Sequence, residues 1–524
     1  MVSKNLFKST GSVKKAIKPV NAVNNAGGVA YTMDDKAALA QLAMTGCFNG
    51  TYYVDAKDQL NQVVALANKL PVEFVAKLAV YARQEGFMKD MPAVLAAVVA
   101  SKDTVLLSKI FPKVIDNPKM VRNFVQVIRS GVTGRKSLGT RPKKLIQNYL
   151  NSLTDEQLFK ADVGNSPSLQ DIIKLARPKP ATKNRSALYG YLLDKEYNPE
   201  DLCSLVQEFE SFKKEMSLDI PNVPFQMLTA LPLTDKHWSK IAENATWNQT
   251  RMNLNTFARH KVFEDATTLN LLAERLADSS QIAKAKVFPY QLFAAFKNVT
   301  ADVPKKLTNA LQKAADASLE NIPAIEGEVH VLVDVSGSMS SPVTGNRGFV
   351  TSTMRCIDVA ALMASALMRK NEDTKVYPFD TRVHNHSLNP MDSVMTNAAT
   401  LAAFGGGGTD CGMALENLNK QKAKGNLVIY VSDNESWVDT TPNSYYSQRG
   451  TKVMEEWNKY KARNPKAKLV CIDVTPNKTT QAHNREDIIN IAGFSDQVFD
   501  VIALFQKFGN NKDLWVQTID SVEM

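Results

Sequence analysis

The chain has 524 residues, more than one hydrophobic core usually supports, so at least two domains are expected. Its hydrophobic content of 44% and charged content of 22% are ordinary for a folded globular protein, and its longest apolar run, residues 91–100, is too short to cross a bilayer. Five scattered cysteines without a C-x-x-C pair argue against a disulfide framework or a zinc site and favour a cytoplasmic protein, while the formal net charge of +10 indicates a polyanionic partner.

The N-terminal segment is basic. Residues 1–33 contain five lysines and no acidic residue, and no apolar segment typical of a secretory signal follows them. We therefore expect residues 1–33 to be a mobile basic arm. An organellar presequence is the weaker alternative, because such peptides favour arginine and this segment has none.

Residues 34–322 have the pattern of a helical domain. Apolar residues recur at intervals of three and four, as expected for amphipathic helices, in the segments 57–70, 72–84, 93–111, 122–132, 155–162, 169–176, 199–216 and 267–278. Breaks are expected at Pro71, Pro92, Pro112 and Pro118. Many short helices joined by tight turns predict an α-solenoid of helical repeats, although the sequence shows no clean period.

Two strongly basic segments lie in this helical domain, and no acidic residue occurs between Asp116 and Asp155. A solvated helix face normally interleaves both signs, so the pattern predicts a surface that binds a phosphate backbone; the alternative is a surface that is merely basic. No aromatic RNA-recognition motif or zinc knuckle is present, so base readout is not predicted. The candidate residues are Arg135, Lys136, Arg141, Lys143, Lys144, Lys174, Arg177, Lys179 and Lys183.

Residues 222–263 are rich in amides and basic residues within a helical apolar pattern. Amides inside a helix cost propensity and compete with the backbone for hydrogen bonds. Two interpretations stay open: these side chains satisfy carbonyl groups between repeats, or they line a nucleic-acid surface. The residues concerned include Arg251, Asn253, Asn255 and Arg259.

Residues 323–524 have a different pattern. Short β-branched runs at 328–335, 374–379, 426–432 and 468–474 alternate with amphipathic helical segments, and a last helix is expected at 498–508. This alternation predicts a doubly wound α/β domain, in which ligands bind beyond the carboxyl ends of the strands.

Hard oxygen ligands follow these strands. Asp334, Ser336 and Ser338 come after the first strand, Asp433 follows a later one, and Thr409 follows four glycines and precedes a helix. Two carboxylates and three hydroxyls suit Mg²⁺, which prefers octahedral oxygen geometry. The alternative is a set of polar turns at strand ends.

No catalytic motif was found. The sequence contains no G-x-S-x-G, no G-x-G-x-x-G and no P-loop, since Arg135 stands where a P-loop requires glycine. A two-metal nuclease needs clustered carboxylates, and the predicted site has two acids among hydroxyls. We therefore expect a protein that is not an enzyme.

The five predicted metal ligands resemble the metal-ion-dependent adhesion site of von Willebrand factor A domains. Together with GTYYV (50–54), QDIIKLARPKP (170–180) and TRMNLNTFARH (250–260), they make nearly the whole chain similar to the TROVE-domain family. The resemblance implies a ring of HEAT-like helical repeats closed by the A domain. It also implies binding of small noncoding Y RNA on a basic outer surface and of single-stranded ends of misfolded RNA in a central hole.

Carried over by position, the resemblance assigns Lys143, Lys144, Lys174, Arg177 and Lys179 to RNA contact and Arg251, Asn253, Asn255 and Arg259 to the inner face of the ring. One departure concerns the Y-RNA contact, because Leu169-Gln170 stand where family members have a histidine. The expected function is that of a monomeric, cytoplasmic RNA-binding scaffold in RNA quality control or stress response, with an exoribonuclease as a possible partner. The alternative is a metal-dependent protein-interaction module that grips a carboxylate of its partner.

Overall fold

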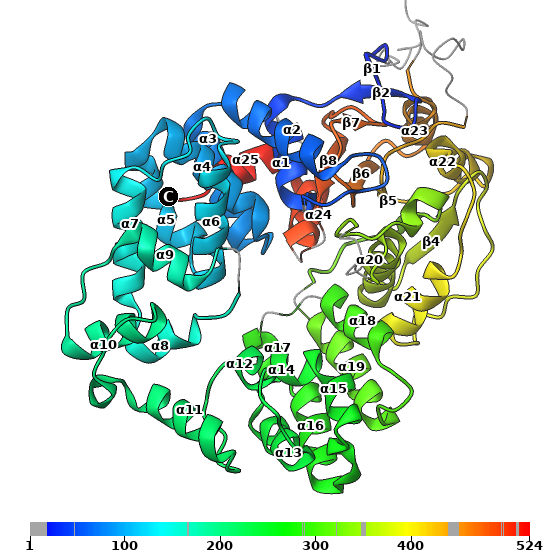
Figure 1. Ribbon diagram of the computed structural model, residues 1–524. Helices are drawn as coiled ribbons and strands as arrows, with labels where there is room; N and C mark the ends of the chain where they lie inside the picture. The colour runs from blue at the N-terminus through cyan, green and yellow to red at the C-terminus, as the bar shows by residue number, and fades with distance from the viewer. Residues whose placement is uncertain are drawn as a thin grey trace, which may run out of the picture.

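The computed structural model describes residues 18–524 except 47, 165–166, 286, 288, 321, 347–352, 439–449, 494, 496 and 510–512. A helical part is followed by an α/β part, called here the A domain (residues 329–520) (Figure 1). The predicted fold class, helical repeats followed by a doubly wound α/β domain, is confirmed. Within the described residues, no helix combines the length and the apolar character needed to cross a membrane.

In the first half of the helical part, helices pack mainly against those one or two positions away along the chain, as in a solenoid, and this holds from α1 to α7. In the second half, α16 and α19 are the central helices, and α13, α14, α17 and α18 pack against them. The helices are α1 (Asp35–Thr45), α2 (Ala56–Lys69), α3 (Val72–Gln84), α4 (Asp90–Lys102), α5 (Thr104–Val114), α6 (Pro118–Ser130), α7 (Thr140–Ser152), α8 (Asp155–Lys160), α9 (Leu169–Ala176), α10 (Lys183–Leu192), α11 (Ser204–Glu215), α12 (Phe225–Leu228), α13 (Asp235–Asn244), α14 (Trp247–Met252), α15 (Leu254–Arg259), α16 (Ala266–Ala277), α17 (Ser279–Ala285), α18 (Pro289–Asn298) and α19 (Lys305–Ser318).

Two of the four predicted proline breaks are wrong. Pro71 and Pro118 stand at helix starts, as expected, but Pro92 lies in the first turn of α4 and Pro112 lies inside α5. The first turn of a helix tolerates proline because its N–H groups have no intrahelical partner there. Pro112 is tolerated two residues before α5 ends at Val114. The break between α4 and α5 comes instead from Asp103, whose side chain accepts hydrogen bonds from the first amides of α5.

The A domain is built on a five-stranded parallel sheet in the order β4-β3-β5-β6-β8. The strands β3 and β5 are buried along their whole length, because α20 covers one face of the sheet and α22 and α23 cover the other. The elements are β3 (Val329–Asp334), α20 (Cys356–Lys370), β4 (Thr374–Phe379), α21 (Val394–Ala402), α22 (Cys411–Lys420), β5 (Leu427–Ser432), α23 (Lys452–Arg463), β6 (Lys468–Asp473), β7 (Thr479–Thr480), β8 (Ile488–Ala492), α24 (Gln497–Phe508) and α25 (Leu514–Asp520).

The prediction of a mobile arm over residues 1–33 is wrong for its described part. The strands β1 (Ala22–Val23) and β2 (Val29–Thr32) pair with each other, and β2 also pairs with β7 of the A domain. Three of the four β2 residues are buried. Apolar residues in this segment therefore attach it to the A domain. Residues 1–17 lie outside the described residues.

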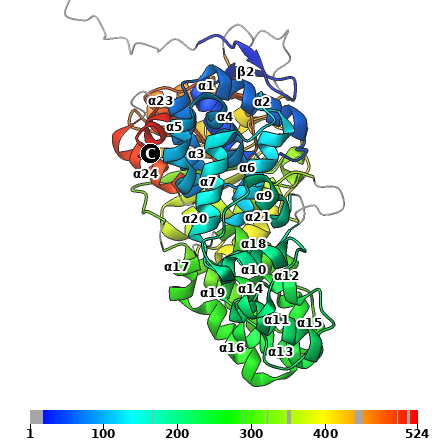
Figure 2. The ribbon, with the colours of Figure 1, turned by 60° about the vertical axis from the view of Figure 1, so that its left-hand side comes forward.

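Both ends of the helical part contact the A domain. At the first end, α1 and α3 pack against α25, α1 also packs against β8, and Lys36 Nζ lies 2.8 Å from Asp520 Oδ2. At the other end, α18 and α19 pack against α20 and α21, and Lys297 Nζ donates to the buried Asp358 Oδ2 at 2.7 Å. Between these contacts the helices follow an arc that extends away from the A domain (Figures 1 and 2).

Candidate metal centre and basic surface

The first ligand loop of the predicted metal site begins where β3 ends. Asp334 is fully buried, and its two carboxylate oxygens accept hydrogen bonds from the Ser336 amide at 2.9 Å and the Ser432 hydroxyl at 2.6 Å. Ser336 Oγ lies 3.3 Å from Ser338 Oγ, at the start of the short 3-10 turn Gly337–Ser340. The three predicted ligands of this loop therefore point to one place at the carboxyl edge of the sheet.

The glycine run brings Thr409 to the same edge. Gly337 N donates to Gly407 O at 3.0 Å, so the glycine loop lies directly against the first ligand loop. A Cβ added to Gly407 would lie 2.5 Å from Asp380 Oδ2, which explains why a side chain is excluded there. Thr409 is buried, and its carbonyl accepts from the amide of Trp437, beyond Asp433.

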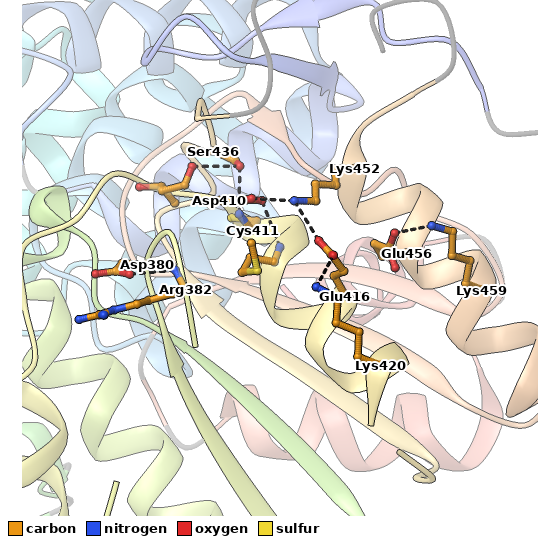
Figure 3. A network of polar contacts seen from close by, with 12 residues as sticks. Asp380, Arg382, Asp410, Cys411, Glu416, Lys420, Ser436, Lys452, Glu456 and Lys459 are labelled. Atoms are coloured by element: carbon orange, nitrogen blue, oxygen red, sulfur yellow. Dashed lines mark hydrogen bonds and ion pairs between the residues drawn. The ribbon is translucent and has the colours of Figure 1, made fainter. Parts of the chain in front are cut away.

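Asp410 fixes the end of the glycine loop (Figure 3). Its Oδ1 accepts from Met413 N at 3.1 Å and caps α22, while its Oδ2 lies 2.8 Å from Lys452 Nζ on α23. Lys452 also lies 3.3 Å from Glu416 on α22. This ion-pair network joins α22 to α23. Because Asp410 directly follows Thr409, the network also fixes the position of the Thr409 backbone.

The two acids of the site are close enough to affect each other. Burial, and then the charge of Asp433, raise the pKa of Asp334 above its usual range. Burial also raises the pKa of Asp433, to which the Ser338 side chain hydrogen-bonds. Burial raises the pKa of Glu435 as well. Hydrogen bonds from Ser432 and Ser336 to Asp334, and from Ser338 to Asp433, oppose the rise in pKa.

These residues fit a divalent cation. Two buried carboxylates that repel each other gain from a cation between them, and three hydroxyls supply the neutral oxygens that Mg²⁺ accepts. Across the described part of the chain, no group of three or more His, Cys, Asp or Glu side chains is arranged to hold a metal ion. A metal held at this edge would therefore depend on the serine and threonine hydroxyls.

Sequence reasoning missed three residues around these ligands. Ser432, which binds Asp334, immediately precedes Asp433, and a hydroxyl at a strand end was the available signal. Glu435 lies two residues beyond Asp433, and Asn25 Nδ2 donates to its Oε1 at 2.9 Å. Tyr53, from the loop before α2, hydrogen-bonds to the Ser338 side chain. No local pattern indicates that Tyr53 reaches a loop almost 300 residues away.

The basic segments lie over the packed helices α7 and α9 and the start of α10. The two helices pack together, and Gln147 Nε2 of α7 donates to the carbonyl of Ala176 at 2.7 Å. Lys143 is half-buried. The exposed residues, called here the basic surface, are Lys136, Arg141, Lys144, Lys174, Arg177, Lys179 and Lys183.

Arg135 has a different role from the predicted one. Its guanidinium donates to three backbone carbonyls, those of Ser137, Leu138 and Ala100, at 3.1, 2.9 and 2.8 Å. Arg135 therefore braces the loop between α6 and α7 against the end of α4, and each of its three guanidinium nitrogens donates one of these bonds.

We expect Arg135→Ala to lower the free energy of unfolding by about 1–3 kcal/mol, because it leaves partly buried carbonyls without a donor. Urea titration followed by circular dichroism measures this change. An unchanged midpoint together with lost RNA affinity would contradict the bracing role.

The sequence left two interpretations open for residues 222–263: contacts between repeats, or a nucleic-acid surface. Some of its residues have the first role, and others are available for the second. Arg251 Nη1 donates to Gln291 O at 3.0 Å. Asn255 Nδ2 donates to Asn298 O at 2.6 Å, and its Oδ1 accepts from Thr300 N at 3.0 Å, so these two residues join α14 and α15 to α18 and the loop after it. Asn253, between α14 and α15, is half-buried and donates to Gln249 O of α14, whereas Arg259 is exposed.

Comparisons with known proteins agree with this architecture. The family described as the Ro60 vWA domain matches residues 329–506. The RNA-binding protein RO60 of Deinococcus radiodurans is 23% identical over 530 aligned residues, which cover 92% of this chain and 95% of that protein. The crystal structure of the RO (RSR) protein of Deinococcus radiodurans superposes with a TM-score of 0.61 and 17% identity, covering 90% of this chain and 99% of that one. Residues 329–506 therefore match the von Willebrand factor A domain of Ro60 proteins, and the chain is similar to Ro60 proteins over nearly its whole length.

Proposed function

We propose that this protein is a non-enzymatic RNA-binding scaffold. The observation that carries the proposal is the basic surface, where seven exposed cationic side chains lie on α7 and α9, in the segments beside them and at the start of α10. Such a surface neutralises phosphates and releases counterions, which gives affinity without sequence readout. The similarity to a relative named as an RNA-binding protein supports the same class of ligand.

The finer assignment is that structured RNA of the Y type binds the basic surface, while single-stranded ends of misfolded RNA enter a central hole. The contacts that both ends of the helical part make with the A domain support an enclosed hole. A cavity of about 740 Å³ lies where α3, α17, α19 and α24 meet. Its lining includes Glu85, Glu320 and Asp500, and the Arg83 side chain that also lines it is paired with Asp116, so the basic surface offers phosphates more cations than this cavity does.

The biological role that fits this binding is RNA quality control or stress response by a monomer in the cytoplasm. An exoribonuclease is the protein partner that such a role calls for, because a scaffold without a hydrolytic site can present an RNA end but cannot remove it. Because Leu169-Gln170 replace a histidine of the related proteins, the contacts to structured RNA would come from Arg177 and the neighbouring lysines.

The A domain supports a second candidate function. Asp334, Ser336, Ser338, Thr409 and Asp433 would hold one Mg²⁺, and an ion bound by few charges remains electrophilic toward a carboxylate of a partner protein. The buried, mutually repelling aspartates favour this function. A chelator should abolish such binding, whereas added salt should weaken RNA binding.

We expect Arg259→Ala to weaken binding of single-stranded RNA ends by about 3-fold to 10-fold without affecting stability, because the side chain is exposed. Asn255→Ala should instead lower stability by about 1–2 kcal/mol and leave RNA affinity unchanged. Filter binding with a single-stranded oligonucleotide and with a duplex, together with thermal denaturation, measures both. An equal loss for both RNAs after Arg259→Ala would argue against a hole that admits one strand.

Sequencing of the RNA that copurifies with the protein tests the proposed function directly. Enrichment of small structured noncoding RNAs and of transcripts with extended 3′ ends is expected. Copurified RNA that matches the composition of total cellular RNA would reduce the proposal to nonspecific binding.

A further inference from the structure

Two loops of the A domain that carry predicted metal ligands are hydrogen-bonded to the N-terminal segment of the chain. Asn49 Nδ2 donates to Thr344 O at 2.6 Å, and Asn346 N donates to Gly50 O at 2.7 Å, which pairs these segments as an isolated antiparallel bridge. The loop that begins with Ser338 is therefore attached to residues 49–53, called here the docking loop.

The docking loop also reaches the ligand positions. Tyr53 hydrogen-bonds to the side chain of Ser338, which in turn hydrogen-bonds to Asp433. The neighbouring Tyr52 points elsewhere, since 63% of it is exposed and its ring meets that of Tyr53 edge-on at 4.7 Å. Of these two adjacent tyrosines, only Tyr53 contacts the predicted site.

A second segment of the same end holds the Asp433 loop. Asn25 Nδ2 donates to Glu435 Oε1 at 2.9 Å and Ala26 N to Glu435 Oε2 at 3.1 Å, while Asn24 Nδ2 donates to Ser436 O at 2.9 Å. Two of the three loops that carry predicted ligands are thus positioned by residues that precede α2.

We propose that Tyr53 is a positioning residue of the metal site and that Mg²⁺ binding and attachment of the docking loop stabilise each other; this inference rests on the proposed metal site. By contacting the Ser338 side chain, Tyr53 would hold the Ser338 oxygen in the orientation that a bound Mg²⁺ requires. Partners of this kind orient the ligands of metal sites and contribute to affinity. By linkage, if bound Mg²⁺ strengthens docking by some factor, docking strengthens Mg²⁺ binding by the same factor.

Through this coupling, a movement of helices in the helical part would change the affinity of the metal site in the A domain. The docking loop leads directly into α2, which begins at Ala56 and packs against α1, α3 and α4. A ligand that shifts these helices would change the affinity of the metal site without touching it. The coupling therefore links the helices around α2 to the metal site, whereas the basic surface lies farther along the chain, on α7 and α9.

Two variants and one matched control test the coupling, with Mg²⁺ itself as the probe. Calorimetry should show Mg²⁺ binding roughly 10-fold weaker in Tyr53→Phe, which loses only the hydroxyl. Asn49→Ala should weaken Mg²⁺ binding about 2-fold to 10-fold, although Asn49 touches no ligand, because it loosens the docking loop. Tyr52→Phe should match the unaltered protein.

Hydrogen exchange measures the reciprocal effect. Mg²⁺ should slow exchange of the Asn346 amide, which donates to Gly50, in the unaltered protein and in Tyr52→Phe but not in Tyr53→Phe. Equal Mg²⁺ affinity in all four proteins would overturn the coupling while leaving the metal site intact. If Mg²⁺ binding were weaker in Tyr53→Phe but not in Asn49→Ala, Tyr53 would act only on Ser338, and the coupling to the docking loop would also be overturned. Absence of Mg²⁺ binding in the unaltered protein would overturn the metal site itself and the coupling with it.

Discussion

Replacing Lys144, Lys174, Arg177 and Lys179 with alanine is expected to lower the affinity for structured RNA by at least about 100-fold at physiological salt. All four side chains are exposed on or beside α7 and α9. Each lost phosphate contact removes roughly 0.7–0.9 from the slope of log affinity against log salt concentration, so the slope should fall by about three. Filter binding over a range of salt concentrations measures both quantities.

A matched control distinguishes the loss of contacts at the basic surface from the loss of net positive charge. Alanine at Lys420, Lys424, Lys459 and Lys466, which are exposed on the A domain, removes the same charge elsewhere. We expect the control to keep the salt slope of the unaltered protein. An equal loss in both proteins would mean that long-range attraction, and not contact at the basic surface, accounts for binding.

The parts of the fold that could be predicted are those with a local signal. The strand β3 and the place of the polar residues after it were predictable because an apolar run buried on both faces must end at the binding edge of a parallel sheet. The helix α3, at Val72–Gln84, matches the predicted segment because its apolar spacing is regular. The edge strand β8 and the short helix α25 were missed, since five and seven residues are too few for a periodic pattern.

The roles that could not be predicted depend on contacts between distant residues. Arg135 and the exposed Lys136 are neighbours with the same charge, yet only the folded chain shows that Arg135 is bonded to three carbonyls. Asn255 and Arg259 lie one turn apart on α15, and the carbonyl of Asn298 decides which of them is structural. The same limit applies to Tyr53, whose contact with Ser338 joins two domains.

The effect of pH on the metal-free protein has a definite sign. Burial raises the pKa of Asp334 to about 7 and that of Asp433 to about 6, compared with about 3.9 for an aspartate in an unfolded chain. Between about pH 4 and pH 7 the folded state therefore binds more protons than the unfolded state, and its stability should fall as pH rises. Above pH 7 both carboxylates are charged and repel each other, unless a cation lies between them.

Added Mg²⁺ should accordingly stabilise the protein at pH 8 and have little effect at pH 5. A concentration of about 100 times the dissociation constant corresponds to a rise in melting temperature on the order of 5 °C. Thermal denaturation at both pH values, with Mg²⁺ or with a chelator, measures the difference. A rise of the same size at pH 5 would show that Mg²⁺ acts somewhere other than on these carboxylates.

Asp334→Asn should abolish the response to Mg²⁺ and make the metal-free protein more stable at pH 8 than the unaltered protein. The substitution keeps the shape of the side chain and removes one of two buried charges, so the repulsion disappears together with the site. RNA affinity should remain unchanged, because the basic surface lies on α7 and α9 of the helical part. If a folded Asp334→Asn protein lost its RNA affinity, the metal site would belong to the RNA-binding function and the division of labour between the two domains would be wrong.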